Sequence, residues 1–546
     1  MKTSVLRPVL LYISPEAVIP AKVRLGARLS AKPSEAWAGI QIKNTGFRVK
    51  PGMTLKVKGL LMQYTIVCLL LLFFIVGCAV GPNFVRPKPP AVERYTWGAE
   101  PTTTVTADGQ VQRFEKGAQV AGDWWRLFNS PKIDAVLKEA LANNQTLQAA
   151  QASLRQSQES LRAGYGVFFP QFNAGFSASR QKFSLANIGS TSPSILFNLF
   201  TLATTVNYTI DVFGGERRAV EGLRAQVDVQ HYTALATYLT LTGNVVNTVV
   251  AQAAYRDQIK ATEEMIRLLK EQVQITETQV KAGIAPYSNL LSVQSQLEAT
   301  EATLPPLQQN LSQAEHLLAT LAGRLPAEWT PPEVGLGDLK LPSDLPISLP
   351  SDLVRQRPDI LVAEAQLHSA SANIGVTTAA LFPTVTLDGT YGVDSLSIRH
   401  LFEKASKYWS LAGDASTPLF HGGTLWFQRK AAIEGYQQSL ANYRQTVLSA
   451  FAQVANTLRA LEHDADALRA QSQALDSAKE AFRLIQINYQ AGLVNYLQVL
   501  IADGQYYQAK IGYLQALAQR FQDTIALFVA LGGGWWNAEA KILGGS

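Results

Sequence analysis

One cysteine in this sequence stands in a context that leads to acylation. Cys78 follows Ile75-Val76-Gly77 within an uncharged run from Gly59 to Val85. This pattern is typical of a lipobox, where a signal peptide is cut before the cysteine, whose sulfur receives diacylglycerol and whose new amino group receives palmitate. We therefore predict that Cys78 is lipidated. The alternative is a plain membrane anchor with an incidental cysteine, because the run is just long enough to span a bilayer.

The segment before this cysteine is longer than a signal peptide, which normally has about 15–30 residues. Residues 53–77 have an ordinary length, begin with Met53 and keep the basic Lys56 and Lys58. We assign them as the lipoprotein signal peptide. We interpret residues 1–52 as an upstream mis-start or an unstructured extension.

Removal of the leader changes the charge of the chain. The whole sequence has 48 basic and 42 acidic residues, of which residues 1–77 hold 11 and 2. The rest has 37 basic and 40 acidic residues, net −3, so the basic balance gives no argument for nucleic-acid binding. Cys68 also leaves, so no disulfide can form. Residues 78–122, with the proline-rich 86–90, are predicted to be an extended lipid-anchored linker.

Other residues that could carry chemistry are present but not grouped. No Walker-type phosphate loop and no Ser/His/Asp arrangement is recognisable, and Gly532-Gly533-Gly534 indicates a helix-ending cap. We therefore predict no enzymatic activity, and no metal or cofactor besides the lipid. The histidines lack metal-ligand spacing and are His231, His316, His368, His400, His421 and His463.

The chain after the linker contains an internal repeat. Four landmarks recur in the same order at offsets of 207 to 213 residues, which indicates a duplication. We place the two repeats at residues 123–335 and 336–536, followed by a tail at 537–546. The landmark pairs are Phe168-Phe169-Pro170 with Leu381-Phe382-Pro383, Phe213-Gly214-Gly215 with Phe420-His421-Gly422-Gly423, Lys281-Ala282-Gly283 with Gln490-Ala491-Gly492, and Leu321-Ala322-Gly323 with Leu531-Gly532-Gly533.

Long helices with a seven-residue period are predicted in both repeats. Seven apolar positions from Val447 to Tyr489 are seven residues apart, and six of the seven positions 209 residues earlier are apolar. This period indicates a left-handed coiled coil rather than an ordinary amphipathic helix. A helix from Glu216 to Val280 would be about 100 Å long, so the helices must form something elongated. The heptad positions are Val447, Val454, Leu461, Leu468, Leu475, Phe482 and Tyr489.

Each long helix is expected to turn back on itself. Gly283 and Gly492 follow the last heptad positions, where a left-handed cap needs glycine. Return helices are predicted at about 287–322 and 496–530, the first interrupted by Pro305-Pro306. Each repeat should therefore form a helical hairpin with a tight tip.

Four segments between the helices alternate apolar and polar residues and are predicted to be β-strands. They cover residues 172–179, 202–212, 385–391 and, more weakly, 408–419. At about ten residues each they match transmembrane strands, although a soluble β-subdomain would have the same pattern. Four strands cannot close a barrel, and open edges cannot face lipid. We therefore predict that identical chains share one barrel.

Several motifs together resemble the NodT-type outer-membrane lipoproteins of the TolC-like family. The resemblance extends from Cys78 to Trp536. It rests on Cys78-Ala79-Val80-Gly81-Pro82-Asn83-Phe84, Asp123-Trp124-Trp125-Arg126-Leu127-Phe128, Arg357-Pro358-Asp359-Ile360, Tyr489-Gln490-Ala491-Gly492 with Asn495-Tyr496-Leu497, and Ala530-Leu531-Gly532-Gly533-Gly534-Trp535.

This resemblance implies an α+β membrane protein with two tandem repeats per chain. The family fold is a homotrimer, with a twelve-strand β-barrel in the lipid of the outer membrane and a long α-helical coiled-coil barrel in the periplasm. Its partners are a periplasmic adaptor (membrane fusion protein) and an inner-membrane pump, usually of the resistance-nodulation-division (RND) class. Ala79 stands where an aspartate commonly signals inner-membrane retention, so we expect a lipid-anchored protein of the cell outer membrane.

The resemblance also suggests a pore gate just beyond the second tip. In the family a ring of leucine and aspartate narrows the pore there. Leu497 matches the leucine, Ile501 stands where the aspartate is often found, and the nearest acid is Asp503. A hydrophobic constriction is therefore favoured over an acidic ring. Alternatively, all three residues simply pack between helices.

The exposed tip turns are candidates for contact with the adaptor. They contain Gly283 and Ile284 in the first repeat, and Gly492 and Leu493 in the second. The alternative is that these residues only cap helices.

We conclude from the sequence that the chain is an outer-membrane channel subunit of a tripartite efflux system, passively conducting small molecules to the exterior. The main alternative is a type I protein-secretion duct on the same fold, against which the lipobox argues. A non-transporting coiled-coil lipoprotein is a third interpretation, against which the paired strand segments argue. The transported substrate cannot be read from the residues.

Overall fold

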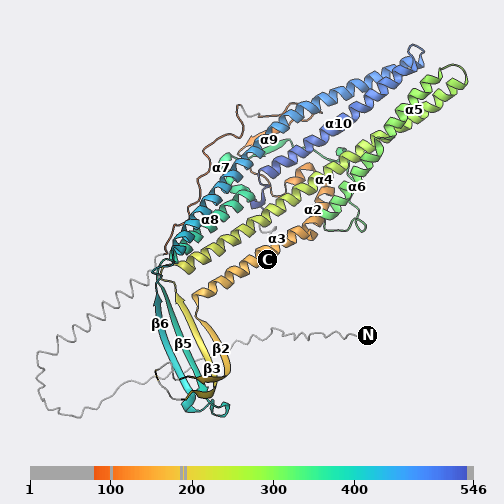
Figure 1. Ribbon diagram of the computed structural model, residues 1–546. Coiled ribbons are helices and arrows are strands. Elements are labelled where there is room, and N and C mark those ends of the chain that lie inside the picture. The colour runs from red at the N-terminus through yellow and green to blue at the C-terminus, as the bar shows by residue number, and fades with distance from the viewer. Residues whose placement is uncertain (1–78, 99–101, 185–188, 190–192, 538–546) are drawn as a thin grey trace, which may run out of the picture. The chain divides into compact units, whose positions relative to one another are not determined.

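The computed structural model describes residues 79–98, 102–184, 189 and 193–537. The predictions for the N-terminal extension, the signal peptide, Cys78 and all but the first residue of the tail therefore lie outside the described residues. Within this part, both halves pass through helices, two strands and a helical hairpin (Figure 1). The first half contains η1 (Trp124–Phe128), α2 (Pro131–Asn143), α3 (Gln145–Gly164), η2 (Tyr165–Phe168), β2 (Gln171–Phe183), β3 (Ile195–Ile210), α4 (Gly215–Lys281), α5 (Tyr287–Glu301) and α6 (Leu304–Leu321).

The second half repeats this order, with one unbroken return helix and with additional short elements. It contains η4 (Leu336–Asp338), β4 (Asp344–Ile347), α7 (Pro350–Gln356), α8 (Pro358–Ala379), β5 (Thr384–Ser395), η5 (Ile398–His400), η6 (Lys404–Ser406), β6 (Lys407–Ser416), α9 (Thr424–Gln490), α10 (Tyr496–Ala530) and η7 (Trp535–Asn537).

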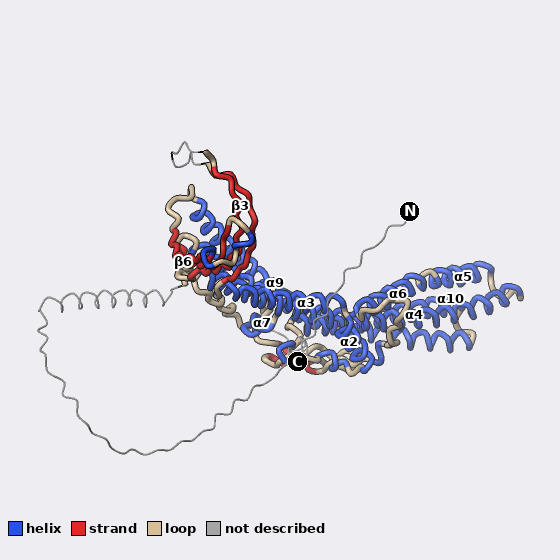
Figure 2. The backbone as a smooth tube through the Cα atoms, turned by 90° about the horizontal axis from the view of Figure 1, so that it is seen from below, coloured by secondary structure: helices blue, strands red, loops and turns tan. Residues whose placement is uncertain are grey.

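The four predicted strands form one antiparallel sheet in the order β2-β3-β5-β6 (Figure 1). Figure 2 shows these strands, in red, gathered at one end of the helices. The four strands have 13, 16, 12 and 10 residues, so the first three are longer than the sequence pattern predicted. The repeat boundary lies between β3 and β5, which pair with each other. Each repeat thus contributes two strands, and β2 and β6 are left at the edges of the described sheet.

The predicted long helices are confirmed as α4 and α9, each of 67 residues and so about 100 Å long. Each begins after a glycine with positive φ, Gly214 at +79° and Gly423 at +84°. By length and hydropathy, α4 could cross a membrane, but 67% of its most apolar stretch is buried inside the protein. We therefore interpret α4 as a core helix.

The return helices also follow the prediction. The first is broken at Ala302-Thr303, and Pro305 and Pro306 follow at the start of α6, where the missing N–H groups are tolerated. The second, α10, is unbroken. The heptad positions from Val447 to Leu468 are buried, whereas the last three, toward the tip, are only partly covered.

The sequence predicted an extended linker, but part of the linker is folded. Its residues Arg113–Lys116 form β1, which pairs in parallel with β4 of the second half. The folded part is held to α10 by a buried polar network, because Gln112 donates to the Thr524 hydroxyl and Arg520 donates to Gln112. The proline-rich composition of residues 86–90, on which the linker prediction rested, did not predict this folded part.

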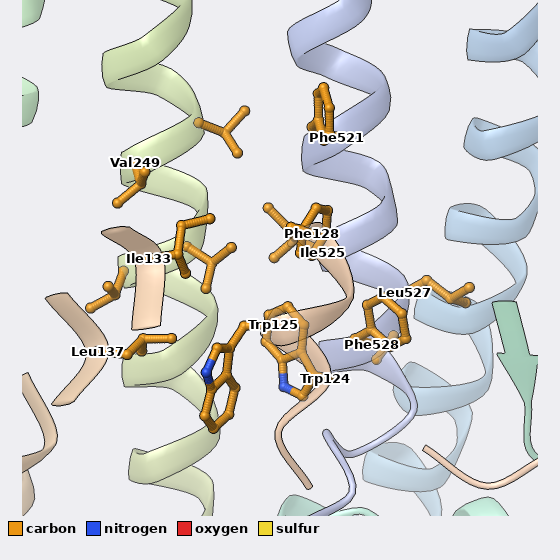
Figure 3. Packing of buried hydrophobic residues seen from close by; sticks show 14 of the residues in the cluster. Trp124, Trp125, Phe128, Ile133, Leu137, Val249, Phe521, Ile525, Leu527 and Phe528 are labelled. Carbon is orange, nitrogen blue, oxygen red and sulfur yellow. The ribbon is translucent and has the colours of Figure 1, made fainter. Parts of the chain in front are cut away.

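The main hydrophobic core lies around η1 and the C-terminal part of α10, where residues distant in sequence meet (Figure 3). Trp124 stacks on Phe528 with ring centroids 5.2 Å apart, and both side chains are fully buried. We call this region the central core. It joins α4, α10, α2 and the linker, so it connects the two repeats.

Candidate functional site

The two hairpin tips have the same backbone geometry. Gly283 and Gly492 have φ values of +70° and +73°, and each ends its long helix in a Schellman motif. In the first tip, Gly283 N–H donates to Val280 and Ile284 N–H to Gln279; the second tip makes the equivalent bonds. The predicted left-handed caps are thus confirmed.

The residues after these glycines are exposed. Ile284 is 76% exposed and Leu493 is 74% exposed. A Cβ atom added to Gly283 or Gly492 would meet nothing within 4 Å. The tips therefore present apolar side chains on open turns. Glycine is needed at Gly283 and Gly492 because the backbone has a positive φ there, and not because space for a side chain is lacking.

The three predicted gate residues do not share one face of α10. Leu497 and Ile501 are one helical turn apart and about half exposed, at 54% and 53%. Asp503 is only 5% exposed and faces the opposite side of the helix. The structure thus separates Asp503 from the other two. Asp503 lies six residues after Leu497, which is more than one and a half helical turns. The Asp503 side chain therefore points away from the exposed stripe that contains Leu497.

The exposed stripe of α10 changes character along its length. Beyond Leu497 and Ile501 it continues with the exposed Gln505 and Gln508. Large apolar side chains on this stripe therefore occur next to the tip, whereas the stripe is polar further up. A narrow hydrophobic section at the tip is compatible with this pattern.

Near the tips the two hairpins contact each other through small clusters. Val293 of α5 packs with Tyr496 and Val499 of α10. Further along, Met265 and Leu269 of α4 pack with Tyr507, whose hydroxyl lies 2.9 Å from that of Thr262. A hydrogen bond of 3.1 Å from Gln279 to the Tyr489 hydroxyl also joins α4 to α9.

The segment that follows Cys78 is bound tightly at the junction of sheet and helices. Val80 N–H donates to the Phe213 carbonyl at 2.9 Å. The buried Arg218 donates to the carbonyls of Val80 and Gly81 and to the Asn83 side chain. A Cβ on Gly81 would lie 2.5 Å from the Gly375 backbone. This segment therefore fits closely between α4 and α8.

Two further residues have equivalent roles that sequence reasoning missed. Asn144 donates to the Leu321 carbonyl at the end of α6, and Arg357 donates to the Ala530 carbonyl at the end of α10. Each also stands directly before a helix of its own repeat, α3 or α8. Their separation of 213 residues equals that of the Phe-Pro landmark, which was the available signal. This equivalence could not be recognised from the sequence because the two positions hold different residue types, asparagine and arginine.

The helix caps also correct one repeat offset. Gly323 and Gly532 are the positive-φ residues that follow α6 and α10, and both lie in the same place in a Schellman motif. The structural equivalent of Gly323 is therefore Gly532, at an offset of 209, rather than Gly533. Gly532 to Gly534 do form the helix-ending cap that was predicted.

A four-stranded sheet continued by two very long helical hairpins defines a class of protein, the TolC-like outer-membrane channels. The family model "Outer membrane efflux protein" matches residues 136–324 and 349–533, one stretch in each half. The chain therefore belongs to the outer membrane efflux protein family. Among the described residues, no group of three or more His, Cys, Asp or Glu side chains could hold a metal ion.

Individual relatives agree with this assignment. The pyoverdine export outer membrane protein OpmQ of Pseudomonas aeruginosa is 30% identical over 79% of this chain and 92% of its own length. SilC of Salmonella typhimurium, named a probable outer membrane lipoprotein, is 27% identical over 85% of this chain and 97% of its own. The solved outer-membrane channel OprN has a TM-score of 0.75 and 26% identity, covering 84% of this chain and all of OprN. The chain is thus an outer-membrane efflux protein that extends into the periplasm.

Proposed function

We propose that the chain forms a homotrimeric channel, with a twelve-strand barrel in the outer membrane and a helical tunnel in the periplasm. The observation that carries this proposal is an aromatic pair at the repeat boundary. Phe213, after β3, stacks on Phe382, before β5, with ring centroids 4.8 Å apart. Their repeat equivalents, Phe420 and Phe169, are 85% and 66% exposed.

The internal boundary supplies a template for a boundary between copies. Within the chain, β3 of the first repeat pairs with β5 of the second. The equivalent pairing would join β6 of one copy to β2 of the next, and would bring Phe420 against Phe169 of that copy. The unpaired edges of β2 and β6 would then be satisfied, as a hydrocarbon environment requires.

The helices support the same arrangement. In the second repeat, α8 packs against both α9 of its own repeat and α4 of the first. The equivalent α3 packs mainly against α4 of its own repeat. In a closed ring, the opposite face of α3 would pack against α9 of the preceding copy.

The number of copies follows from the size of the barrel. Two copies would give eight strands, and the interior of such a barrel is just wide enough to be filled by side chains. Three copies give twelve strands and leave room for a water-filled lumen. The solved relatives of this fold are outer-membrane channels, which agrees with an open interior.

A cross-linking experiment tests this assembly. A Phe169→Cys/Phe420→Cys variant, oxidised in membranes, should give covalent dimers and trimers on a denaturing gel. The matched control is Phe213→Cys/Phe382→Cys, whose bond forms within one chain and should leave the mass unchanged. If the first variant gave only monomers while the control pair oxidised, the proposed ring would be wrong.

The channel would act with a periplasmic adaptor and an inner-membrane pump, usually an RND pump, because the chain itself offers no recognisable energy source. The relatives are named for pyoverdine export and for cation efflux, which favours small solutes over the alternative of type I protein secretion. Passive conduction, without catalysis, is the proposed role. The tips at Gly283-Ile284 and Gly492-Leu493 would contact the adaptor.

The gate would consist of Leu497, with Ile501 one turn further on. Leu497→Ala shortens an exposed apolar side chain and should raise single-channel conductance and passive antibiotic entry in cells that lack the adaptor. Leu484→Ala, at a similarly exposed apolar position on α9, is a suitable control. Unchanged conductance in Leu497→Ala would refute the gate.

Lipidation of Cys78 would place the anchor at the membrane surface. Its diacylglycerol and palmitate would start one peptide bond from Ala79, whose backbone lies against Gly214 between the sheet and α4. Labelled palmitate should enter the wild-type chain and not Cys78→Ala. Labelling of both proteins would show that the acylated residue lies elsewhere.

A further inference from the structure

Asp503 occupies an unusual place on α10. Tyr496, Val499, Asp503 and Tyr507 are spaced by three, four and four residues, so they form one buried face of the helix. Asp503 is the only acid on this stripe. Its side chain is 5% exposed, and its Oδ1 atom has no hydrogen-bond partner among the described residues.

The buried face around Asp503 belongs to the contact between the two hairpins. Tyr496 and Val499, on one side of Asp503, pack against Val293 of α5. Tyr507, on the other side, packs against Met265 and Leu269 of α4. Asp503 therefore lies between two apolar clusters that hold α10 to the first hairpin, about two turns from the exposed Leu497.

Within the part of the chain that the structure describes, no charged side chain compensates this carboxyl group. The helices that carry these clusters also form the ion pairs Glu264–Lys510, Lys270–Glu301 and Glu480–Arg483. Each is formed between partly or largely exposed groups that pair with one another. In the two clusters on either side of Asp503, the titratable groups are tyrosines, Tyr489, Tyr496 and Tyr507. Burial raises the pKa of Asp503 to about 6.

We propose that Asp503 is a proton-dependent lock between the two hairpins, in which the neutral side chain holds α10 against the first hairpin and the ionised side chain favours its release. The lock rests on the proposed tip gate, because Leu497 is on the same helix and must move when α10 shifts. An ionised carboxylate is costly between apolar clusters, whereas in a loosened contact it would be reached by water.

The direction of the pH effect follows from the pKa difference. In the packed arrangement the pKa of Asp503 is about 6, whereas a water-exposed aspartate titrates near 4. Below about pH 4 the group is neutral in both arrangements, and packing is favoured most. Between about pH 4 and 6 release becomes easier by roughly tenfold per pH unit, up to about 100-fold, and above this range the effect is constant.

Single-channel recording of the full-length trimer across pH 4.5 to 7.5 tests the lock. The wild type should open less often as the pH falls below about 6. Asp503→Asn mimics the neutral form, so it should open rarely at every pH and lose the pH dependence. Glu480→Gln removes an exposed carboxylate at a similar level of the neighbouring helix and should keep the wild-type profile.

The outcomes separate the lock from the channel proposal. If Asp503→Asn kept the pH profile of the wild type, or opened more often than it at pH 7, the lock would be wrong while the channel would stand. If the wild type passed no current at any pH, the channel proposal itself would fail, and the lock with it. Trimer recovery on a gel shows that the asparagine variant has folded.

Discussion

The central core and the hairpin tips use glycine in the same left-handed conformation, but with different surroundings. At the tips, Gly283 and Gly492 have open space where a Cβ would stand. In the central core, a Cβ on Gly534 would overlap the carbonyl oxygens of Val120 and Ala121, and one on Gly532 would lie 2.8 Å from that of Gln356. The core therefore uses glycine for close backbone approach, and the tips use it to turn the chain.

This difference separates what holds the protein together from what it offers to partners. The motifs Asp123–Phe128 and Ala530–Trp535 meet in the central core, and Arg357 of the motif Arg357–Ile360 donates to the Ala530 carbonyl at its edge. There, Trp124 stacks on Phe528 and the Trp535 indole donates to Gln356. The tips contain little that stabilises the fold, so substitutions there should change interactions more than stability.

The largest expected effect is that of Gly534→Ala. The new methyl group would meet backbone oxygens that cannot move independently of the linker, and the residue would keep a φ of +68°. We expect a loss of about 2–4 kcal/mol, from overpacking and from the left-handed conformation. Thermal unfolding in detergent, followed by helical circular dichroism, would measure it. Gly492→Ala is the matched control, and equal losses in the two variants would contradict the comparison.

A smaller effect is expected from Arg357→Met. Arg357 is 7% exposed and donates to the buried Ala530 carbonyl and to the exposed Gln453 side chain, so the change leaves the Ala530 carbonyl without this donor. We expect a loss of about 1–3 kcal/mol. Near the tips, Arg483→Met breaks only a pair between exposed side chains and should leave the unfolding temperature unchanged. A similar shift in both variants would show that the core has no special dependence on its caps.

Much of this architecture could be predicted because its signals are periodic. The heptad pattern placed α4 and α9, and the glycines placed both tips. The role of Arg357 was missed, because its repeat equivalent is Asn144, and two different side chains perform the same capping. The separation of Asp503 from Leu497 was missed because both the gate and the packing alternative treated the two residues together, whereas the helix turns Asp503 to the opposite, buried face. The fold of the linker was missed because β1 pairs with a strand that lies far away in sequence.

The smallest effect on stability is expected at the tips, and it sharpens the comparison most. Gly283→Ala/Gly492→Ala keeps the turns small and should cost about 1 kcal/mol at each site, from the left-handed conformation alone. Gly283→Leu/Gly492→Leu adds bulk to the same open turns and should abolish export, measured as antibiotic resistance, while the trimer still forms. Both variants strain the backbone alike, so a loss of export in the leucine variant alone would point to contact with a partner. If the leucine variant exported normally, the tips would serve only to reverse the chain. If the alanine variant also failed, the shape of the turn itself would be what the partner recognises.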